Sequence, residues 1–196
     1  MSEQQYQAVV IGASAGGLQA LSTILRQLPQ NYALPVIVVQ HIAEDMTPLL
    51  ADYLDKCHDI SVREAEELQP IESGTVYIAP ASYHLLIEED KTFSLSIDPR
   101  VQYARPSIDV LFESAADVFG ANLVGVILTG ANSDGSQGLR TIKAMGGMTV
   151  VQNPDTAESP EMPSMAIAGT TVDHLLTVEE IGLLLAELTH WNKGNL

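Results

Sequence analysis

A glycine-rich junction at residues 12–17 constrains the fold of this chain more than any other segment. It follows the apolar run 8–11 and precedes an amphipathic stretch. This order predicts a buried strand that turns directly into a helix. Ser14 stands at the corner of the predicted turn, between Gly12 and Gly16. In such a turn a serine hydroxyl stands clear of the sheet, and the backbone N–H groups that follow it face any negative charge beside it.

Two kinds of glycine-rich turn compete at this position. The segment 12–16 satisfies the G-x-S-x-G pattern of a nucleophile elbow, but glycine-rich strand-to-helix turns also bind phosphate. A dinucleotide site needs glycine where Ser14 stands, and a P-loop needs a lysine, whereas the first lysine of this chain is Lys56. The turn alone leaves open a catalytic serine and a phosphate-binding or purely structural turn.

Composition limits the class of protein and its partners. The chain has 196 residues, of which 46% are hydrophobic, and this fits a single α/β domain over residues 1–196. The 25 acidic and 9 basic residues give a formal net charge of −16, which disfavours nucleic acid and anionic membrane surfaces as partners. Cys57, the single cysteine, lacks the ligand spacing of a zinc site. The sequence has neither a secretory signal pattern nor a long apolar span, so we expect a cytoplasmic protein without membrane insertion.

Short β-branched runs alternate with longer helical patterns along the chain. This alternation is typical of βαβ units, so we expect a doubly wound α/β fold, with a mostly parallel sheet and helices on both faces. Asp45 is the expected N-cap of the second helix, and Thr177 with Glu180 predicts a capping box for the last one. The expected strands lie near 7–11, 35–40, 61–65, 124–128, 148–152 and 172–175, and the expected helices near 17–28, 46–57, 108–119, 135–145, 163–168 and 178–189.

The segment 74–97 breaks this alternation. Its three strand-like runs, 76–79, 84–87 and 93–97, are too close together to hold crossover helices. We therefore expect them to pair antiparallel, with a hairpin turn at 88–91, as an extension on one edge of the sheet.

Three polar residues follow predicted parallel strands. Ser14 follows the first strand, His41 directly follows the second, and Asp134 lies in the loop after 124–128. If the strand 124–128 lies beside the first strand, the ligand crevice of such a sheet forms over Ser14. These side chains suit nucleophilic acyl transfer, in which His41 takes the Ser14 proton and Asp134 orients and stabilises the imidazolium. The backbone N–H of Ala15 would hold the oxyanion.

The same residues also have structural interpretations. A histidine at a strand end is commonly a hydrogen-bonded structural residue, and Asp134 before Gly135 fits a helix cap. Tyr77, His84 and Met162 either line the crevice or pack in the core. The order serine, histidine, aspartate differs from the order serine, acid, histidine of α/β-hydrolases.

Ordered blocks of the chain resemble the catalytic domain of CheB-type protein-glutamate methylesterases of bacterial chemosensory systems. The resemblance covers nearly the whole chain and implies that Ser14, His41 and Asp134 form a catalytic triad. It implies hydrolysis of glutamate methyl esters on the cytoplasmic helices of methyl-accepting chemoreceptors, with release of methanol, and in some members deamidation of receptor glutamines. It implies no metal or organic cofactor. The blocks that carry it are residues 10–17, 38–41, 76–80, 105–112, 125–130, 133–135, 152–153 and 162–163.

The chain departs from the family pattern in the loop after Gly130. The family commonly has Met-Gly where this sequence has Ala131 and Asn132, so a side-chain contribution to the oxyanion site is in question there, although the backbone N–H of Ala131 could still serve. Asn132 is a candidate polar substitute. Arg105 is expected either to contact carboxylates on the substrate or to neutralise Asp109.

Classical chemotaxis methylesterases of this family carry an N-terminal receiver domain and a linker that cover the active site until the receiver is phosphorylated. Here the predicted strand before the elbow starts at residue 7, which leaves no room for a receiver. We therefore expect a stand-alone esterase that is controlled by a separate regulatory protein, by its expression level or not at all. The alternative hypotheses are a binding or scaffold module of a chemosensory-like pathway that has lost turnover, and, less favoured, a nucleotide-binding domain.

Overall fold

The computed structural model describes residues 6–43 and 46–188. Its elements follow the expected alternation, with ends that differ from the predictions by a few residues. The expected cap Asp45 lies outside the described residues. The strands are β1 (Ala8–Ala13), β2 (Val36–Gln40), β3 (Ser61–Glu64), β4 (Thr75–Ile78), β5 (His84–Ile87), β6 (Phe93–Ser96), β7 (Leu123–Ile127), β8 (Met148–Gln152) and β9 (His174–Leu176). The α-helices are α1 (Gly17–Leu25), α2 (Thr47–Cys57), α3 (Ile108–Phe119), α4 (Ser136–Ala144), α5 (Glu161–Gly169) and α6 (Val178–Glu187).

The main sheet has the strand order β3-β4-β2-β1-β7-β8-β9, and all of its pairs are parallel. The chain winds outward from β1 through β2, returns to β7 on the other side of β1, and then winds outward again. The order therefore reverses at β1, as the sequence analysis required for a crevice at the carboxyl end of that strand. This confirms the predicted doubly wound fold.

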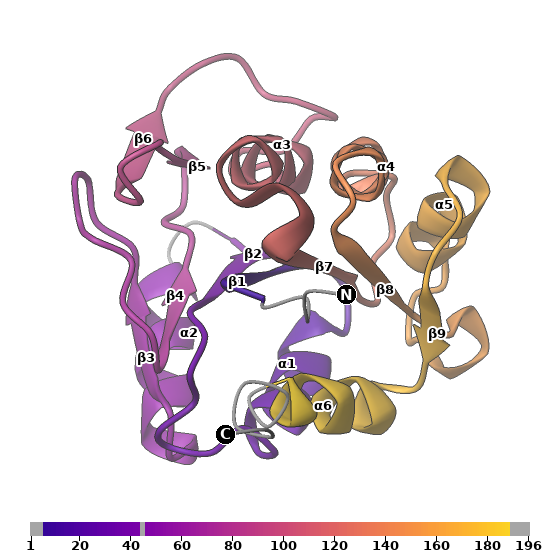
Figure 1. Cartoon of the computed structure of the whole chain (residues 1–196), viewed down its shortest axis with the longest axis horizontal. Helices are drawn as coiled ribbons and strands as arrows, with labels where there is room; N and C mark the ends of the chain where they lie inside the picture. Colours follow the sequence, from indigo (N-terminus) through magenta and orange to yellow (C-terminus); the bar gives the residue numbers. More distant parts are fainter. Residues whose placement is uncertain (1–5, 44–45, 189–196) are drawn as a thin grey trace, which may run out of the picture.

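The strands read as continuous apolar runs because the sheet is buried on both faces. Successive residues of β1 enter different cores: Val9 and Ile11 pack into one, and Ala8 and Val10 into the other. Helices α1, α2 and α6 cover the first face, and α3, α4 and α5 cover the second (Figure 1). In the two described ranges, no helix combines the length and the apolar character that crossing a bilayer requires.

The predicted hairpin exists, but the expectation for its place was wrong. Strands β5 and β6 pair antiparallel as a separate two-stranded sheet that packs on the α3 side of the molecule (Figure 1). Strand β4 does not join them and pairs parallel with β2 and β3. The chain between β3 and β4 crosses over without a helix, and backbone groups of this segment form hydrogen bonds with the hairpin instead. Leu68 N–H donates to Phe93 O (2.9 Å), and Phe93 N–H donates to Gln69 O (3.0 Å).

One glycine brings α3 close to the sheet. A Cβ on Gly12 would lie 2.4 Å from Cγ2 of Ile108, the first residue of α3. Only glycine therefore allows the N-terminus of this helix to approach the carboxyl end of β1 so closely. This contact places the start of α3 beside the site described below.

Candidate active site

Ser14 lies at the carboxyl end of β1, between the ends of β2 and β7. Its backbone N–H donates to Thr129 O in the loop after β7 (3.0 Å), and His41 N–H, directly after β2, donates to Ala13 O (2.9 Å). Gly16 has a φ of 76°, a conformation that favours glycine, and it ends the turn one residue before α1. The predicted strand-turn-helix corner is therefore present, with Ser14 at its apex.

Gln40 ties the Ser14 turn to the His41 turn. Its side chain is 7% exposed, and Nε2 donates to the carbonyl oxygens of Ser14 (2.8 Å) and His41 (3.0 Å). Sequence reasoning assigned no role to Gln40. The available signals were a polar residue at the end of an otherwise apolar strand and its place in the block 38–41 that carries the family resemblance.

Asp134 is fully buried and accepts three hydrogen bonds from the start of α3. Oδ1 accepts from Ser107 Oγ (2.8 Å) and Asp109 N–H (3.0 Å), and Oδ2 accepts from Ile108 N–H (2.7 Å). Burial by itself raises the pKa of Asp134, but polar contacts with His41, the two backbone N–H groups and Ser107 outweigh burial and lower it below its usual value. Asp134 is therefore ionised at neutral pH. It caps α3, not the helix α4 that it precedes in the chain.

Asp109, in the first turn of α3, caps α4 in the same way that Asp134 caps α3. Its buried carboxylate accepts from Gly138 N–H in the first turn of α4 (2.7 Å). Burial raises the pKa of Asp109 to about 6, and the nearby charges of Asp134 and Glu113 add to the increase. The starts of α3 and α4 thus hold each other through two buried carboxyl groups.

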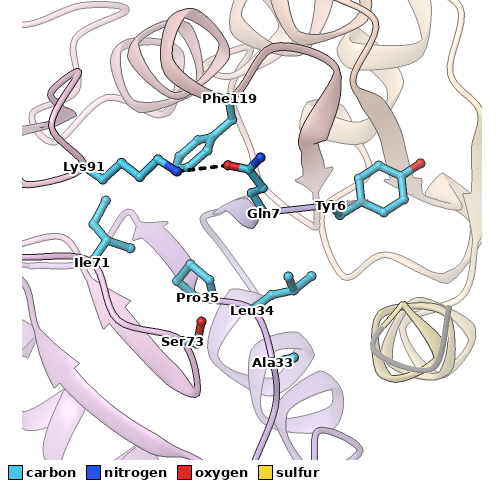
Figure 2. Close-up of a pocket in the computed structure, with 9 residues that line it drawn as sticks. All are labelled: Tyr6, Gln7, Ala33, Leu34, Pro35, Ile71, Ser73, Lys91 and Phe119. Carbon is cyan, nitrogen blue, oxygen red and sulfur yellow. Dashed lines mark hydrogen bonds between the residues drawn. The ribbon is translucent and has the colours of Figure 1, made fainter. Parts of the chain in front are cut away.

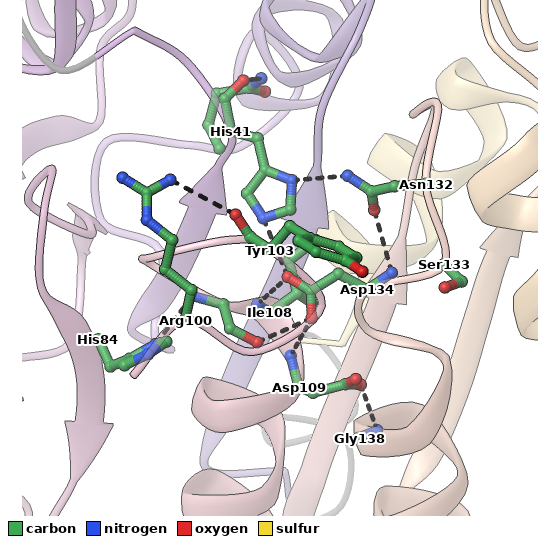
Figure 3. Close-up of polar contacts among 12 residues, drawn as sticks. His41, His84, Arg100, Tyr103, Ile108, Asp109, Asn132, Ser133, Asp134 and Gly138 are labelled. Carbon is green, nitrogen blue, oxygen red and sulfur yellow. Dashed lines mark hydrogen bonds and ion pairs between the residues drawn. The ribbon is translucent and has the colours of Figure 1, made fainter. Parts of the chain in front are cut away.

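His41 lies between Asp134 and Asn132 (Figure 3). Its Nε2 is 3.0 Å from Asp134 Oδ2, and its Nδ1 is 3.2 Å from Asn132 Nδ2. Asp134 N–H in turn donates to Asn132 Oδ1 (3.0 Å). Within residues 6–43 and 46–188, no hydrogen bond joins the Ser14 hydroxyl to the His41 ring. The structure therefore pairs His41 with Asp134 and adds Asn132 to them, and Ser14 lies in the turn next to His41.

Backbone N–H donors surround Ser14. Among the described residues, the N–H groups of Ala15 and Ala131 have no hydrogen-bond acceptor. Ala15 follows Ser14 directly, and Ala131 follows Gly130, where a Cβ would lie 3.0 Å from Ser14 Cβ. The absence of a side chain at Gly130 therefore allows the loop after β7 to approach Ser14 closely.

A cleft of about 390 Å³ opens beside His41 and Asn132, and it is bounded on its other side by Arg100, Tyr103 and Arg105. Figure 3 shows Arg100 on the side of His41 away from Ser133, with its guanidinium donating to the Tyr103 carbonyl oxygen. Tyr103 is 95% exposed and therefore stands at the rim of the cleft.

Arg105 braces the segment that carries this rim. Its Nη1 donates to Ile97 O (2.8 Å) and Asp98 O (3.1 Å). The suggested pairing of Arg105 with Asp109 is not seen among the described residues, where Arg105 bonds to these two carbonyl oxygens and Asp109 accepts from Gly138 N–H. The suggested contact of Arg105 with substrate stays a prediction.

His84 connects two segments that border the site. It is buried, its Nδ1 accepts from Ser107 N–H (3.2 Å), and its Nε2 lies 3.1 Å from Pro99 O. Since Nδ1 accepts, the ring proton is on Nε2, where it can bond Pro99 O. His84 thus links the rim segment to the residue that donates to Asp134.

Tyr77 and Met162 have packing roles. The Tyr77 ring meets Phe93 edge to face at 4.8 Å, and its hydroxyl accepts from Arg63 (3.0 Å), so it belongs to the hairpin core and not to the crevice. Met162 is buried beside Gly130, with its N–H donating to Gly130 O (2.8 Å).

A second, larger cleft of about 530 Å³ lies at the opposite end of the strands (Figure 2). It is lined by Gln7 and Pro35, which precede β1 and β2, and by Lys91, whose Nζ donates to Gln7 Oε1 (3.0 Å). Ligand crevices of open parallel sheets form at the carboxyl ends of the strands, so the smaller cleft at His41 is the candidate site. In the part of the chain that the structure describes, no three His, Cys, Asp or Glu side chains are grouped so as to hold a metal ion.

Comparisons with known proteins agree with this geometry. A family model described as CheB methylesterase matches residues 9–185. A solved structure, the CheB methylesterase catalytic domain of Thermotoga maritima, superposes with a TM-score of 0.90 at 34% identity, covering 94% of this chain and 99% of that one.

Curated relatives give the same result. A Leptospira interrogans protein, provisionally named a protein-glutamate methylesterase/protein-glutamine glutaminase, is 53% identical over 187 residues, which are 95% of this chain and 97% of that protein. An Anaeromyxobacter dehalogenans protein named protein-glutamate methylesterase/protein-glutamine glutaminase 2 is 44% identical, over 93% of this chain and 53% of its own length. With most of its length matched by the family model and by relatives of this similarity, the chain belongs to the CheB methylesterase family.

Proposed function

We propose that this protein hydrolyses methyl esters of glutamate side chains on chemoreceptors and deamidates receptor glutamines, with Ser14 as nucleophile and His41 as base. The observation that carries the proposal is the buried, ionised Asp134 on His41 Nε2, beside Ser14 at the reversal of strand order. A buried carboxylate at one ring nitrogen stabilises the imidazolium that forms when the other nitrogen accepts a proton.

The first half of the reaction forms an acyl-enzyme. The Ser14 hydroxyl attacks the ester carbonyl while its proton moves to His41 Nδ1, since Nε2 is occupied by Asp134. Ser14 and His41 follow residues that are paired in register, Ala13 and Gln40, so they occupy neighbouring positions. Collapse of the tetrahedral intermediate breaks the bond to the methoxy oxygen, which takes the proton from Nδ1 and leaves as methanol.

The second half regenerates the enzyme. His41 Nδ1 removes a proton from water, the resulting hydroxide attacks the acyl carbon, and the bond to Ser14 Oγ breaks with return of the proton to Ser14. The product is the glutamic acid side chain, which releases a proton to solvent and becomes the carboxylate. A glutamine side chain follows the same course, with ammonia as the leaving group in place of methanol.

The oxyanion of each tetrahedral intermediate would be stabilised by the N–H groups of Ala15 and Ala131. Both lack an acceptor among the described residues, and both belong to turns that approach Ser14. Backbone donors of this kind do not depend on the side chain, which supports a role for the loop even with alanine at position 131.

The cleft beside His41 suits a glutamyl side chain that is flanked by other acidic groups. Arg100 and Arg105 line it, and they are two of only 9 basic residues in a chain of net charge −16. Arginines at the rim would attract carboxylates near the methylation site that the rest of the surface repels. The proposed partner is therefore the cytoplasmic helical region of a methyl-accepting chemoreceptor.

The proposal is tested by methanol release from a methylated receptor cytoplasmic fragment and ammonia release from its glutamine form. The wild-type protein should release both, whereas Ser14→Ala and His41→Ala should lose nearly all activity and keep the wild-type circular dichroism spectrum. Equal release by Ser14→Ala would remove the acyl-enzyme mechanism. No release by the wild-type protein, with Ser14 still inert to acylating reagents, would favour the binding-module alternative, which the family membership and the contact between His41 and Asp134 disfavour.

A further inference from the structure

Asn132 closes a ring of polar contacts around the proposed base. Asp134 N–H donates to Asn132 Oδ1 (3.0 Å), Asn132 Nδ2 lies 3.2 Å from His41 Nδ1, and His41 Nε2 lies 3.0 Å from Asp134 Oδ2. Figure 3 shows the Asn132 amide between the His41 ring and the Asp134 backbone. Every member of the ring therefore contacts the two others.

The ring fixes which way the amide points. A backbone N–H only donates, so the Asn132 atom that faces Asp134 N–H must be the amide oxygen. The amide nitrogen then faces His41, and because an NH₂ group only donates, His41 Nδ1 must present its lone pair. A neutral ring with this contact therefore carries its single proton on Nε2, which lies 3.0 Å from Asp134 Oδ2.

The proposed reaction needs this tautomer, but its basic nitrogen, Nδ1, already has a hydrogen-bond partner. The Nδ1 lone pair that must accept the Ser14 proton accepts the Asn132 amide instead. Protonation of Nδ1 would also bring an N–H against the NH₂ group of Asn132, with no acceptor between the two donors. The amide cannot turn its oxygen to the ring without leaving Asp134 N–H unpaired.

We propose that Asn132 is a positioning residue that selects the Nε2-protonated tautomer of His41 and holds its Nδ1 lone pair until substrate displaces the amide. This inference rests on the proposed function only in identifying Nδ1 as the working base. Asn132 and His41 both line the cleft, so a substrate that binds there contacts the amide.

Two substitutions separate this role from a structural one. Asn132→Ala removes the donor to Nδ1. Asn132→Asp keeps the shape and the acceptor for Asp134 N–H but replaces the donor with a carboxylate, which favours a proton on Nδ1. If Asn132 is purely structural, Asn132→Asp should behave like the wild-type protein and Asn132→Ala should not. If Asn132 acts at Nδ1, the properties of His41 should change more in Asn132→Asp than in Asn132→Ala.

The first measurement is nitrogen NMR of the histidine rings, with His41 assigned from the spectrum of His41→Gln. The wild-type protein should show a protonated Nε2 and an unprotonated Nδ1 at neutral pH, and Asn132→Asp should move the proton onto Nδ1. An Nδ1-protonated ring in the wild-type protein, or a ring unchanged by Asn132→Asp, would overturn the proposal. This result does not depend on turnover, so it stands even if the receptor substrate is wrong.

The second measurement is the pH dependence of kcat/KM for methanol release. The acid limb of the profile should lie at the lowest pH for wild type, about 0.5–1 pH unit higher for Asn132→Ala, as expected for loss of one neutral hydrogen bond, and higher again for Asn132→Asp. Ser133→Ala is the control in the same loop, since its side chain lies apart from the His41 ring (Figure 3) and its profile should match wild type. Coincident profiles for wild type and Asn132→Asp would contradict the proposal.

Discussion

At the scale of single residues, Asp134 links the proposed catalysis to folding because one carboxylate would serve both. Oδ2 contacts His41 and the backbone of Ile108, while Oδ1 accepts from Ser107 and from the backbone of Asp109. The same group therefore orients the proposed base and satisfies N–H groups at the start of α3 that would otherwise be buried without partners. Substitution of this residue should affect activity and stability together.

Asp134→Asn should lower kcat/KM by roughly 10³–10⁴-fold, because the amide cannot stabilise the His41 imidazolium as a carboxylate does. It should also lower the free energy of unfolding by about 1–3 kcal/mol through the hydrogen bonds lost to α3. Methanol release and urea unfolding measure the two effects. Asp109→Asn is the matched control, since it alters the neighbouring cap without touching His41, and its activity loss should be far smaller. A variant Asp134→Asn that keeps a tenth of wild-type activity would contradict this role.

The sequence suggested the three proposed catalytic residues but not the residues that position them. Ser14, His41 and Asp134 could be found because each lies in the loop after a predicted parallel strand, where topology brings loops together. Gln40 and Ser107 act through contacts that cross between elements far apart in the chain, to Ser14 and to Asp134. No local pattern encodes such contacts.

At the scale of elements, the facing N-termini of α3 and α4 carry opposite pH dependences. The pKa of Asp134 is lowered, so its stabilising effect is present above the ordinary aspartate pKa and is lost as the pH falls below it. The pKa of Asp109 is raised from 3.8 to about 6, so its contribution is complete below 3.8 and is lost as the pH rises through 6. Between pH 4 and pH 7, only Asp109 of this pair changes its contribution.

The pH dependence of stability can be isolated with Asp109→Asn, which cannot ionise. The free energy of unfolding of wild type should fall relative to that of the variant by up to about 3 kcal/mol between pH 4 and pH 7. Urea unfolding of both proteins at several pH values measures the difference, and the other carboxyl groups cancel in it. If the difference in free energy of unfolding is constant, or if wild type gains stability relative to the variant as the pH rises, folding does not favour the protonated form of Asp109.

The capping box of α6 was predicted correctly from the sequence, with both of its residues. Thr177 Oγ1 accepts from Glu180 N–H (3.3 Å), and Glu180 Oε2 accepts from Thr177 N–H (2.8 Å). Thr177→Ala should lower the free energy of unfolding by about 1 kcal/mol, whereas Thr177→Ser, which keeps the hydroxyl, should stay close to wild type. Thermal unfolding checks this, and esterase activity should be unchanged at a temperature where both variants are folded. Equal melting temperatures for all three proteins would contradict the cap.

Strand β4 shows where prediction of elements failed. Its residues were correctly predicted as a strand, but short flanking loops suggested antiparallel pairing. The loop before β4 instead crosses over without a helix, because Leu68 and Gln69 hydrogen-bond to Phe93 of β6. Pairing partners are determined by such non-local contacts, whereas the apolar pattern of the strand is local.

At the scale of the whole molecule, net charge opposes the encounter with an acidic receptor. The chain carries a formal charge of −16, and screening at physiological ionic strength limits this repulsion to about 8 Å. The arginines that line the cleft attract carboxylates of a bound receptor within that distance. The acidic groups on the rest of the surface repel the receptor over longer distances at low ionic strength. Long-range repulsion and short-range attraction should therefore respond differently to salt.

Turnover of an acidic receptor fragment should rise between low and physiological ionic strength, because screening removes the long-range repulsion first. The effect should be in kcat/KM, since it concerns the encounter. A small neutral methyl ester is the control, and its turnover should hardly change. An unchanged or falling rate on the receptor fragment over this range would contradict unfavourable long-range charge.

The central claim, that His41 activates Ser14 for attack on an acyl carbon, is tested most directly with a fluorophosphonate probe. An activated serine displaces fluoride from phosphorus, and the adduct persists for location by mass spectrometry of peptides. The account predicts an adduct on Ser14 in the wild-type protein and labelling at least a hundredfold slower in His41→Ala, with Asp134→Asn also slowed. Absence of an adduct on Ser14, or labelling of Ser14 at the same rate without His41, would contradict it.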